Sequence, residues 1–233
     1  MIEIRPYDSL GHAHHGWLKA THHFSFADYY DPARMGWGLL RVWNDDKIAP
    51  QSGFPPHPHK DMEIITYVRK GAITHRDDKG YSGKTLAGDV QVMSAGNGII
   101  HSEYNLESEE TLIFQIWILP DRQGHKPSWG SRPFPKAERE GHFVTLASGH
   151  EDDTEALRIQ CHGRVMGATL KKDQVILHKL SPETYAYLVP AAGTITLNNQ
   201  IVKMRDGAAI KEETELTITA LEDCELVMVE TRP

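Results

Sequence analysis

Cysteine is scarce in this chain. Of its 233 residues only Cys161 and Cys224 carry thiols, and the two are far apart in the sequence, outside any CxxC motif. A disulfide framework is therefore not expected. This usage is typical of a reducing compartment, so the sequence predicts a cytoplasmic protein.

Basic charge and long apolar runs are also lacking. The net charge is -7 and no run of Lys and Arg is present, so direct binding to nucleic acid is not expected. The longest strongly apolar stretch, residues 112–119, is interrupted by Gln115 and is too short to span a bilayer. Residues 1–6 show no basic-then-apolar leader. We therefore expect neither a membrane segment nor a secretory signal.

No segment has a long apolar stripe of helical period. Short β-branched and aromatic runs alternate instead with Gly, Asn and Asp, in residues 38–43, 63–68, 113–118, 194–197 and 216–220. Many short strands at regular spacing indicate a sandwich or a closed barrel. The sequence thus predicts an all-β fold with little helix, limited to a turn or two near residues 135–140 or 182–184.

A weak internal repeat indicates two barrels in tandem. Residues 67–74, leading to 86–90, and residues 188–196, leading to 204–208, both read as strand, Gly turn, strand and a second turn. Pro and Gly are frequent in the aperiodic stretch from residue 120 to about 153, which is the expected junction. The predicted domains are residues 1–135 and 150–233.

Two pairs of metal-ligand side chains at i,i+2 spacing are the strongest chemical signal. They are His57 with His59, and His101 with Glu103. Residues two apart in a strand point to the same face, with Cα atoms roughly 6–7 Å apart. Two such strands side by side would bring four ligands to one ion. Three imidazoles and a carboxylate suit divalent iron, nickel, manganese, copper or zinc, so a metalloprotein is predicted.

Glu63 is a competing carboxylate. An extended path from His59 would put it roughly 13 Å away, so it reaches the same ion only if residues 60–62 turn the chain back. Glu103 needs no such turn. We therefore favour Glu103 as the ligand, and expect Glu63 to orient a histidine ring without binding the ion. Either carboxylate remains a candidate general base.

Other residues near these motifs receive structural interpretations. The N-terminal histidines are assigned packing or surface roles, because no carboxylate or further pair flanks them: His12, His14, His15, His22 and His23. One face of the strand near residues 112–118 must line the barrel interior, either Ile113, Gln115 and Trp117 or Leu112, Phe114 and Ile116. The sequence leaves the choice of face open. Phe54 and Gln115 would suit an apolar slot with a polar group.

The motifs resemble those of a known family. Residues 53–59 with Glu63 and Gly71 resemble the first cupin motif, and Gly88, Gly96, His101 and Asn105 the second. Residues 23–32, 56–63 and 98–103 are similar to hallmarks of the pirin family of bicupins. The resemblance covers residues 1 to about 120 and is only architectural after about 150. It implies that His57, His59, His101 and Glu103 bind the metal, with iron the most frequent ion.

The resemblance implies an activity as well. Bacterial members are similar to quercetin 2,3-dioxygenases, so we expect a metal-dependent oxidoreductase that cleaves a flavonol with O2. The family also contains transcriptional co-regulators, so the alternative is a metal or redox sensor that acts on a protein partner. No dinucleotide-binding fingerprint is present, which is consistent with a reaction whose electrons come from the substrate.

The second barrel is predicted to carry no metal. Lys179 and Ser181 stand where the repeat would require the paired histidines, and His178 alone is a poor site. A fragment of residues 150–233 should therefore bind neither iron nor nickel, as measured by elemental analysis. Binding at one ion per fragment would contradict the assignment.

Overall fold

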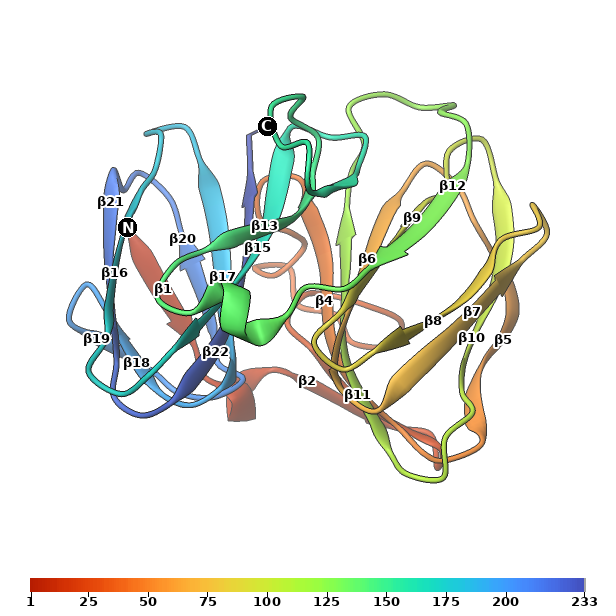
Figure 1. Cartoon of the computed structure of the whole chain (residues 1–233), viewed down its shortest axis with the longest axis horizontal. Helices are drawn as coiled ribbons and strands as arrows, with labels where there is room; N and C mark the ends of the chain where they lie inside the picture. The colour runs from red at the N-terminus through yellow and green to blue at the C-terminus, as the bar shows by residue number, and fades with distance from the viewer. Residues whose placement is uncertain (233) are drawn as a thin grey trace. The chain divides into compact units, whose positions relative to one another are not determined.

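The computed structural model describes residues 1–232, and its regular secondary structure is almost entirely β-strand (Figure 1). Its helical elements are two short 3-10 turns, η1 (Tyr7–Ser9) and η2 (Lys136–Arg139). The second falls where the sequence predicts a helical turn, whereas residues 182–183 form a plain turn. No helix in the described part of the chain is long and apolar enough to cross a membrane. The all-β expectation is confirmed.

The chain divides into two compact units. The N-terminal unit comprises Gly11–Phe134 together with Leu157–Cys161. The C-terminal unit comprises Met1–Leu10, Pro135–Ala156 and the chain from His162 onward. The first strand, β1 (Ile2–Arg5), therefore belongs to the C-terminal unit, because it pairs with β20 (Gly207–Ile210). The two strands are about two hundred residues apart, so no local pattern in the sequence predicts that they pair.

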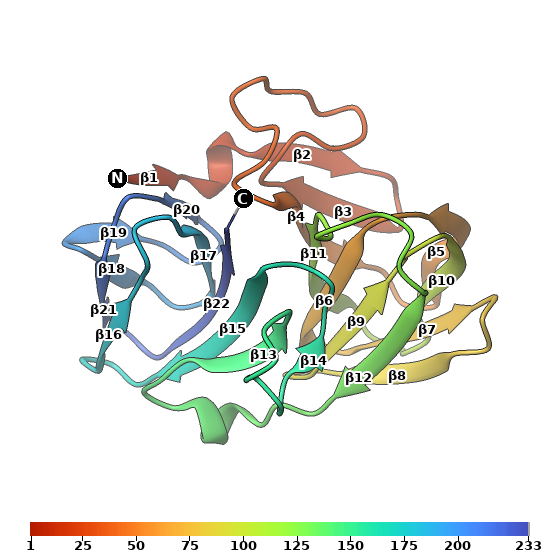
Figure 2. The same ribbon diagram turned by 90° about the horizontal axis from the view of Figure 1, so that it is seen from above.

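The N-terminal unit contains two antiparallel sheets (Figures 1 and 2). The larger sheet has the strand order β12 (Ser128–Arg132), β9 (Val90–Ser94), β6 (Glu63–Lys70), β11 (Thr111–Ile118), β4 (Leu40–Ile48), β3 (Leu18–His22) and β2 (Gly11–His14). The smaller sheet has the order β5 (Ser52–His59), β10 (Ile99–Asn105), β7 (Ala72–Asp77) and β8 (Ser82–Leu86). Val68 and Ile113 of the larger sheet pack with Ile73 of the smaller one, so the sheets face each other across an apolar core.

The C-terminal unit repeats this plan. One sheet has the order β1, β20, β17 (Tyr185–Ala192), β22 (Cys224–Thr231), β15 (Gly163–Leu170) and β13 (Val144–Ser148). The other has β16 (Val175–Lys179), β21 (Glu215–Ala220), β18 (Ile195–Leu197) and β19 (Gln200–Val202). An apolar cluster that includes Leu188, Ile218 and Met228 fills the space between them. The short strand β14 (Leu157–Arg158) lies in the N-terminal unit.

The two copies of the predicted repeat make the same turn. Gly71 follows β6 with φ +76°, and Gly193 follows β17 with φ +77°. A Cβ atom at Gly71 would come within 2.5 Å of the Thr111 hydroxyl, and one at Gly193 within 2.5 Å of the Cys224 Sγ. Backbone conformation and space both require glycine here. The strand–Gly–strand pattern thus marks equivalent hairpins in two cupin-type units, as the sequence predicts.

Asn105 fixes the end of β10, the strand that carries His101 and Glu103. Its side chain is fully buried. The amide nitrogen donates to the carbonyl oxygens of Ile48, Ala49 and Glu109 at 3.2, 3.1 and 2.8 Å, and the amide oxygen accepts from the Glu107 N–H at 3.0 Å. One side chain therefore holds the end of β4 and the loop after β10 together.

Asn105→Ala should destabilise the N-terminal unit by about 2–4 kcal/mol, because it removes four hydrogen bonds to backbone groups that are buried or part-buried. All five tryptophans lie in this unit, so urea unfolding followed by tryptophan fluorescence reports on it. Leu106→Ala is the matched control, since Leu106 is 48% exposed. Equal unfolding midpoints for the two variants would contradict the role of Asn105.

Candidate metal centre

The pairing of β5 with β10 brings three histidines together. His57 and His59 lie two residues apart on β5, and His57 stands opposite His101 in the register. The His57 Nε2 and His101 Nε2 atoms are 3.0 Å apart. The three rings have centroid separations of 4.5–4.9 Å, and one nitrogen from each lies within 4.8 Å of the others. The spacing of nitrogen atoms fits the ligands of a single ion.

Glu103 lies beside this cluster, two residues beyond His101. Between these two residues the register of β10 shifts against β5 but stays regular against β7. Residues two apart in a regular strand share a face, and both side chains are buried. A Glu103 oxygen comes within 4.8 Å of nitrogens of His101 and His75. The structure thus brings the three predicted histidines into one group and places Glu103 next to His101.

Neutral donors hold the Glu103 carboxylate. Its Oε1 accepts from Gln91 Nε2 at 2.6 Å and from the Thr66 hydroxyl at 3.3 Å, and its Oε2 accepts from Gln115 Nε2 at 2.8 Å. Burial raises the pKa of Glu103 to about 7, against the opposing effect of these hydrogen bonds. A carboxylate in such surroundings is stabilised as an anion when a cation lies nearby.

The histidines are prepared to act as ligands. Burial, and then the neighbouring imidazoles, lower the pKa of His101 to about 2 and that of His59 to about 4. Both rings are therefore neutral at pH 7, as metal binding requires. The His57 Nδ1–H donates to the Pro55 carbonyl oxygen at 2.7 Å, which leaves the lone pair on Nε2. Three imidazoles beside a buried carboxylate fit a divalent transition metal.

Glu63 is not brought to the histidines. Thr66 of β6 donates a hydrogen bond to Glu103 and therefore faces the site. Glu63 is three positions before Thr66 in the same strand, so its side chain points to the opposite face. Its Oε2 accepts from the Ser94 hydroxyl at 2.6 Å and from the Gln160 N–H at 3.1 Å. These contacts indicate a structural role, in place of the predicted orientation of a histidine ring.

His75 is a functional candidate that sequence reasoning missed. It is fully buried on β7, with its ring centroid 5.2 Å from that of His101 and stacked on Trp129 at 4.9 Å. The available signal was its i,i+2 spacing to Asp77 within a strand, and His75 Nε2 indeed lies 2.7 Å from Asp77 Oδ2. An isolated His-x-Asp in a chain with fourteen histidines is too common to be recognised without the fold.

Aromatic side chains surround the cluster. The ring of Trp117 is 4.9 Å from that of His59 and 5.4 Å from that of Phe26, and Phe54 lies 6.3 Å from His57. Because Gln115 contacts Glu103 and Trp117 contacts His59, the face of β11 with Ile113, Gln115 and Trp117 is the one that lines the site. This settles the face that the sequence left open.

The N-terminal histidine segment makes packing contacts. His22 Nδ1 lies 2.8 Å from Asn44 Oδ1, and its ring contacts those of Phe26 and Tyr29. His12 Nδ1 lies 3.2 Å from the Thr21 hydroxyl on the neighbouring strand. These contacts agree with the packing role expected for the segment.

Comparison with known proteins finds relatives that match the chain over its whole length. Residues 3–118 match the family model described as Pirin, and residues 145–231 match the model described as Quercetinase C-terminal cupin domain. A pirin-like protein of Caulobacter vibrioides is 64% identical over 99% of both chains. The quercetin 2,3-dioxygenase of Escherichia coli K12 is 40% identical over the full length of both.

A solved structure resembles the whole chain. The bacterial pirin YhhW of Escherichia coli, determined in complex with nickel(II), superposes with a TM-score of 0.94 at 38% identity and covers 100% of both chains. These likenesses extend through both units, beyond the part of the chain in which the sequence motifs lie. The chain belongs to the pirin family.

Proposed function

We propose that this protein is a metal-dependent dioxygenase that cleaves a flavonol such as quercetin with O2. The observation that carries the proposal is the cluster of three histidines beside a buried carboxylate. The similarity to a quercetin 2,3-dioxygenase over the full chain supports the choice of substrate. In this proposal His57, His59, His101 and Glu103 hold one divalent ion. We expect iron, while nickel is the ion in the complex of the similar Escherichia coli protein.

A divalent transition metal held in this way would supply Lewis acidity and a redox centre for the reaction of the substrate with O2. The chain itself supplies the base and the binding surface. Glu103 accepts the proton of the flavonol 3-hydroxyl, because it is the carboxylate that lies beside the histidine cluster. Gln115 and Gln91 keep the carboxylate oriented while the proton moves.

Trp117, Phe26 and Phe54 provide apolar ring surfaces on which a flat polyphenol can pack. Two carbon–carbon bonds of the central ring break, one carbon leaves as carbon monoxide, and both oxygen atoms of O2 are retained in the ester product. The substrate supplies all the electrons, so no nicotinamide or flavin is required. The predicted cytoplasmic location is retained as part of the proposal.

Replacing His59 and His101 together with Ala should abolish stoichiometric metal binding, because two of the three clustered imidazoles are lost. The measurement is elemental analysis of protein purified without chelator and after reconstitution with iron or nickel. The control is the double variant His12→Ala with His14→Ala, a pair of the same spacing on β2. Full metal occupancy in the first variant would exclude the proposed site.

Glu103→Gln should retain part of the metal but lower quercetin turnover per bound ion by roughly 10²–10⁴-fold, because it removes the general base. Glu63→Gln is the control and should change turnover little, since Glu63 faces away from the cluster. Oxygen uptake and metal content are measured on the same samples. A wild-type rate per ion in Glu103→Gln would assign the base elsewhere.

The wild-type protein distinguishes enzyme from regulator. Consumption of quercetin and O2 by protein loaded with iron, nickel, manganese or copper is the expected result. If none of these loaded forms consumes either reactant, the dioxygenase proposal fails. The metal- or redox-sensing regulator of a protein partner then becomes the better account of the site.

A further inference from the structure

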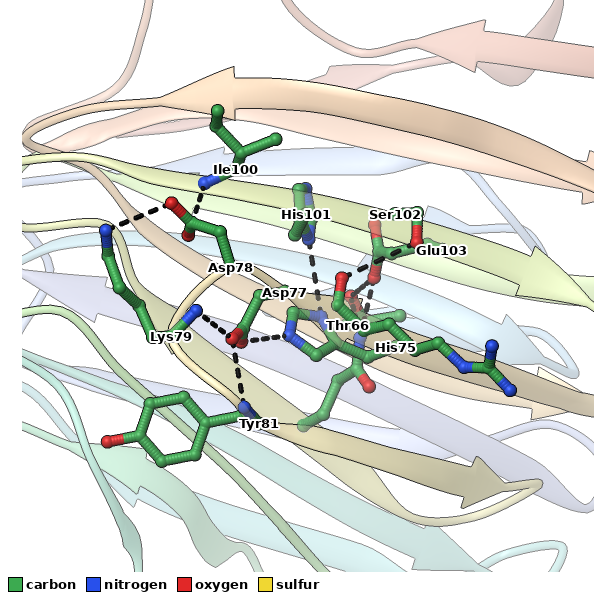
Figure 3. Close-up of polar contacts among 12 residues, drawn as sticks. Thr66, His75, Asp77, Asp78, Lys79, Tyr81, Ile100, His101, Ser102 and Glu103 are labelled. Atoms are coloured by element: carbon green, nitrogen blue, oxygen red, sulfur yellow. Dashed lines mark hydrogen bonds and ion pairs between the residues drawn. The ribbon is translucent and has the colours of Figure 1, made fainter.

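A chain of buried hydrogen bonds leads away from the histidine cluster. His101 Nδ1 lies 3.3 Å from His75 Nδ1, and His75 Nε2 lies 2.7 Å from Asp77 Oδ2 (Figure 3). The second oxygen of Asp77, Oδ1, accepts from the backbone N–H groups of Lys79 and Tyr81 at 2.9 and 3.0 Å. The side chains of His75 and Asp77 are both fully buried.

The direction of each hydrogen bond follows from the Asp77 carboxylate, which ends the series and can only accept. The Asp77 carboxylate accepts, so His75 must carry its proton on Nε2 and present a lone pair on Nδ1. His101 then has to donate from Nδ1 to His75. The remaining lone pair of His101 is left on Nε2, the atom that lies 3.0 Å from His57 Nε2. Asp77, acting through His75, thus sets the tautomer of His101 that leaves Nε2 free for a metal.

The packing around His75 keeps its ring in place. Trp129 stacks on the ring with an interplanar angle of 12°. Gly83, which pairs with His75 across β7 and β8, leaves room for this indole, because a Cβ atom there would come within 2.2 Å of it. The stacked indole therefore helps to hold the His75 ring in its place beside His101 and Asp77.

We propose that Asp77 and His75 are positioning residues that fix the tautomer of His101 and thereby increase the metal affinity of the site. The inference rests on the proposed metal site, with His101 binding through Nε2. Partners of this kind orient metal-binding histidines in other proteins, and their loss typically lowers metal affinity 10–100-fold. Neither residue would contact the ion or the substrate.

The same atoms allow a competing arrangement. Donor atoms of His75, His101 and Glu103 lie within 4.8 Å of one another, as they would around a second ion. That ion would need His101 to bind through Nδ1 as well as Nε2, and hence to lose both ring protons. The hydrogen bond requires no such loss, and the number of bound ions distinguishes the two arrangements.

Asp77→Asn provides a nearly isosteric test. The backbone N–H groups of Lys79 and Tyr81 require an oxygen at the Oδ1 position, so the new amide nitrogen must face His75 Nε2. It would donate there and move the His75 proton to Nδ1, where it opposes the Nδ1–H of His101. We expect a 10–100-fold weaker affinity for nickel in competition with a chelator.

The matched control is Asp78→Asn. Asp78 is the next residue and also accepts a backbone N–H, that of Ile100, at 3.0 Å, but it does not contact His75 (Figure 3). Nickel affinity should equal that of the wild type. A second pair addresses His75 itself. His75→Asn keeps an acceptor near the Nδ1 position and should retain more nickel affinity than His75→Leu, which has none.

NMR of protein with ¹⁵N-labelled histidine reads the tautomers directly, without metal. The expected wild-type result is a proton on Nε2 of His75 and on Nδ1 of His101, with the His75 proton moved to Nδ1 in Asp77→Asn. The opposite wild-type tautomers, unchanged tautomers and affinity in Asp77→Asn, or two nickel ions per chain would each overturn the inference. Wild-type protein that binds no metal would refute both the proposed metal site and the claimed effect on affinity, whereas wrong tautomers in a nickel-binding protein would refute only the inference.

Discussion

The arrangement of polar side chains inside the N-terminal barrel depends on the buried Glu103 carboxylate, which is held by uncharged donors. The side-chain amides of Gln91 and Gln115 donate to Glu103, and each is itself fixed by a further bond. The Thr85 hydroxyl donates to the Gln91 oxygen at 3.1 Å, and the Trp117 indole N–H to the Gln115 oxygen at 3.3 Å. Both amides are therefore oriented with their nitrogens toward the carboxylate. This network spans both sheets and gives the site its rigidity.

A second carboxyl group is buried near Glu103, and Arg69 is the positive charge that acts on it. Asp46 is 2% exposed, and burial, followed by the nearby Asp45 and Glu103, raises its pKa well above the usual value. Burying charged carboxylates without a cation is costly. The raised pKa favours the protonated, uncharged form of Asp46, so Glu103 is the carboxylate that suits a divalent cation beside the histidines.

The C-terminal barrel shows the apolar alternative. Its cluster of Leu, Ile, Val, Ala and Met side chains fills the space between its sheets, and His178 pairs with Glu230 at 2.5 Å. The hairpin turns at Gly71 and Gly193 are equivalent in the two units. The difference thus lies in the side chains that the strands project inward. One architecture serves as a site in one copy and as a packed core in the other.

The sequence by itself determined the strand content, the repeated hairpins and the pairing of His57 with His59, because side-chain alternation and glycine turns are local properties. The i,i+2 spacing was also sufficient to place His101 and Glu103 on one face of β10. Only the tertiary structure decided the rest. Glu63 points away from the histidines although it is close to His59 in the sequence, because it lies on the face of β6 opposite to that of Thr66. His75 lies beside His101, and β1 pairs with β20, because strands far apart in the sequence pair with each other, and a local pattern does not say which distant strands will pair.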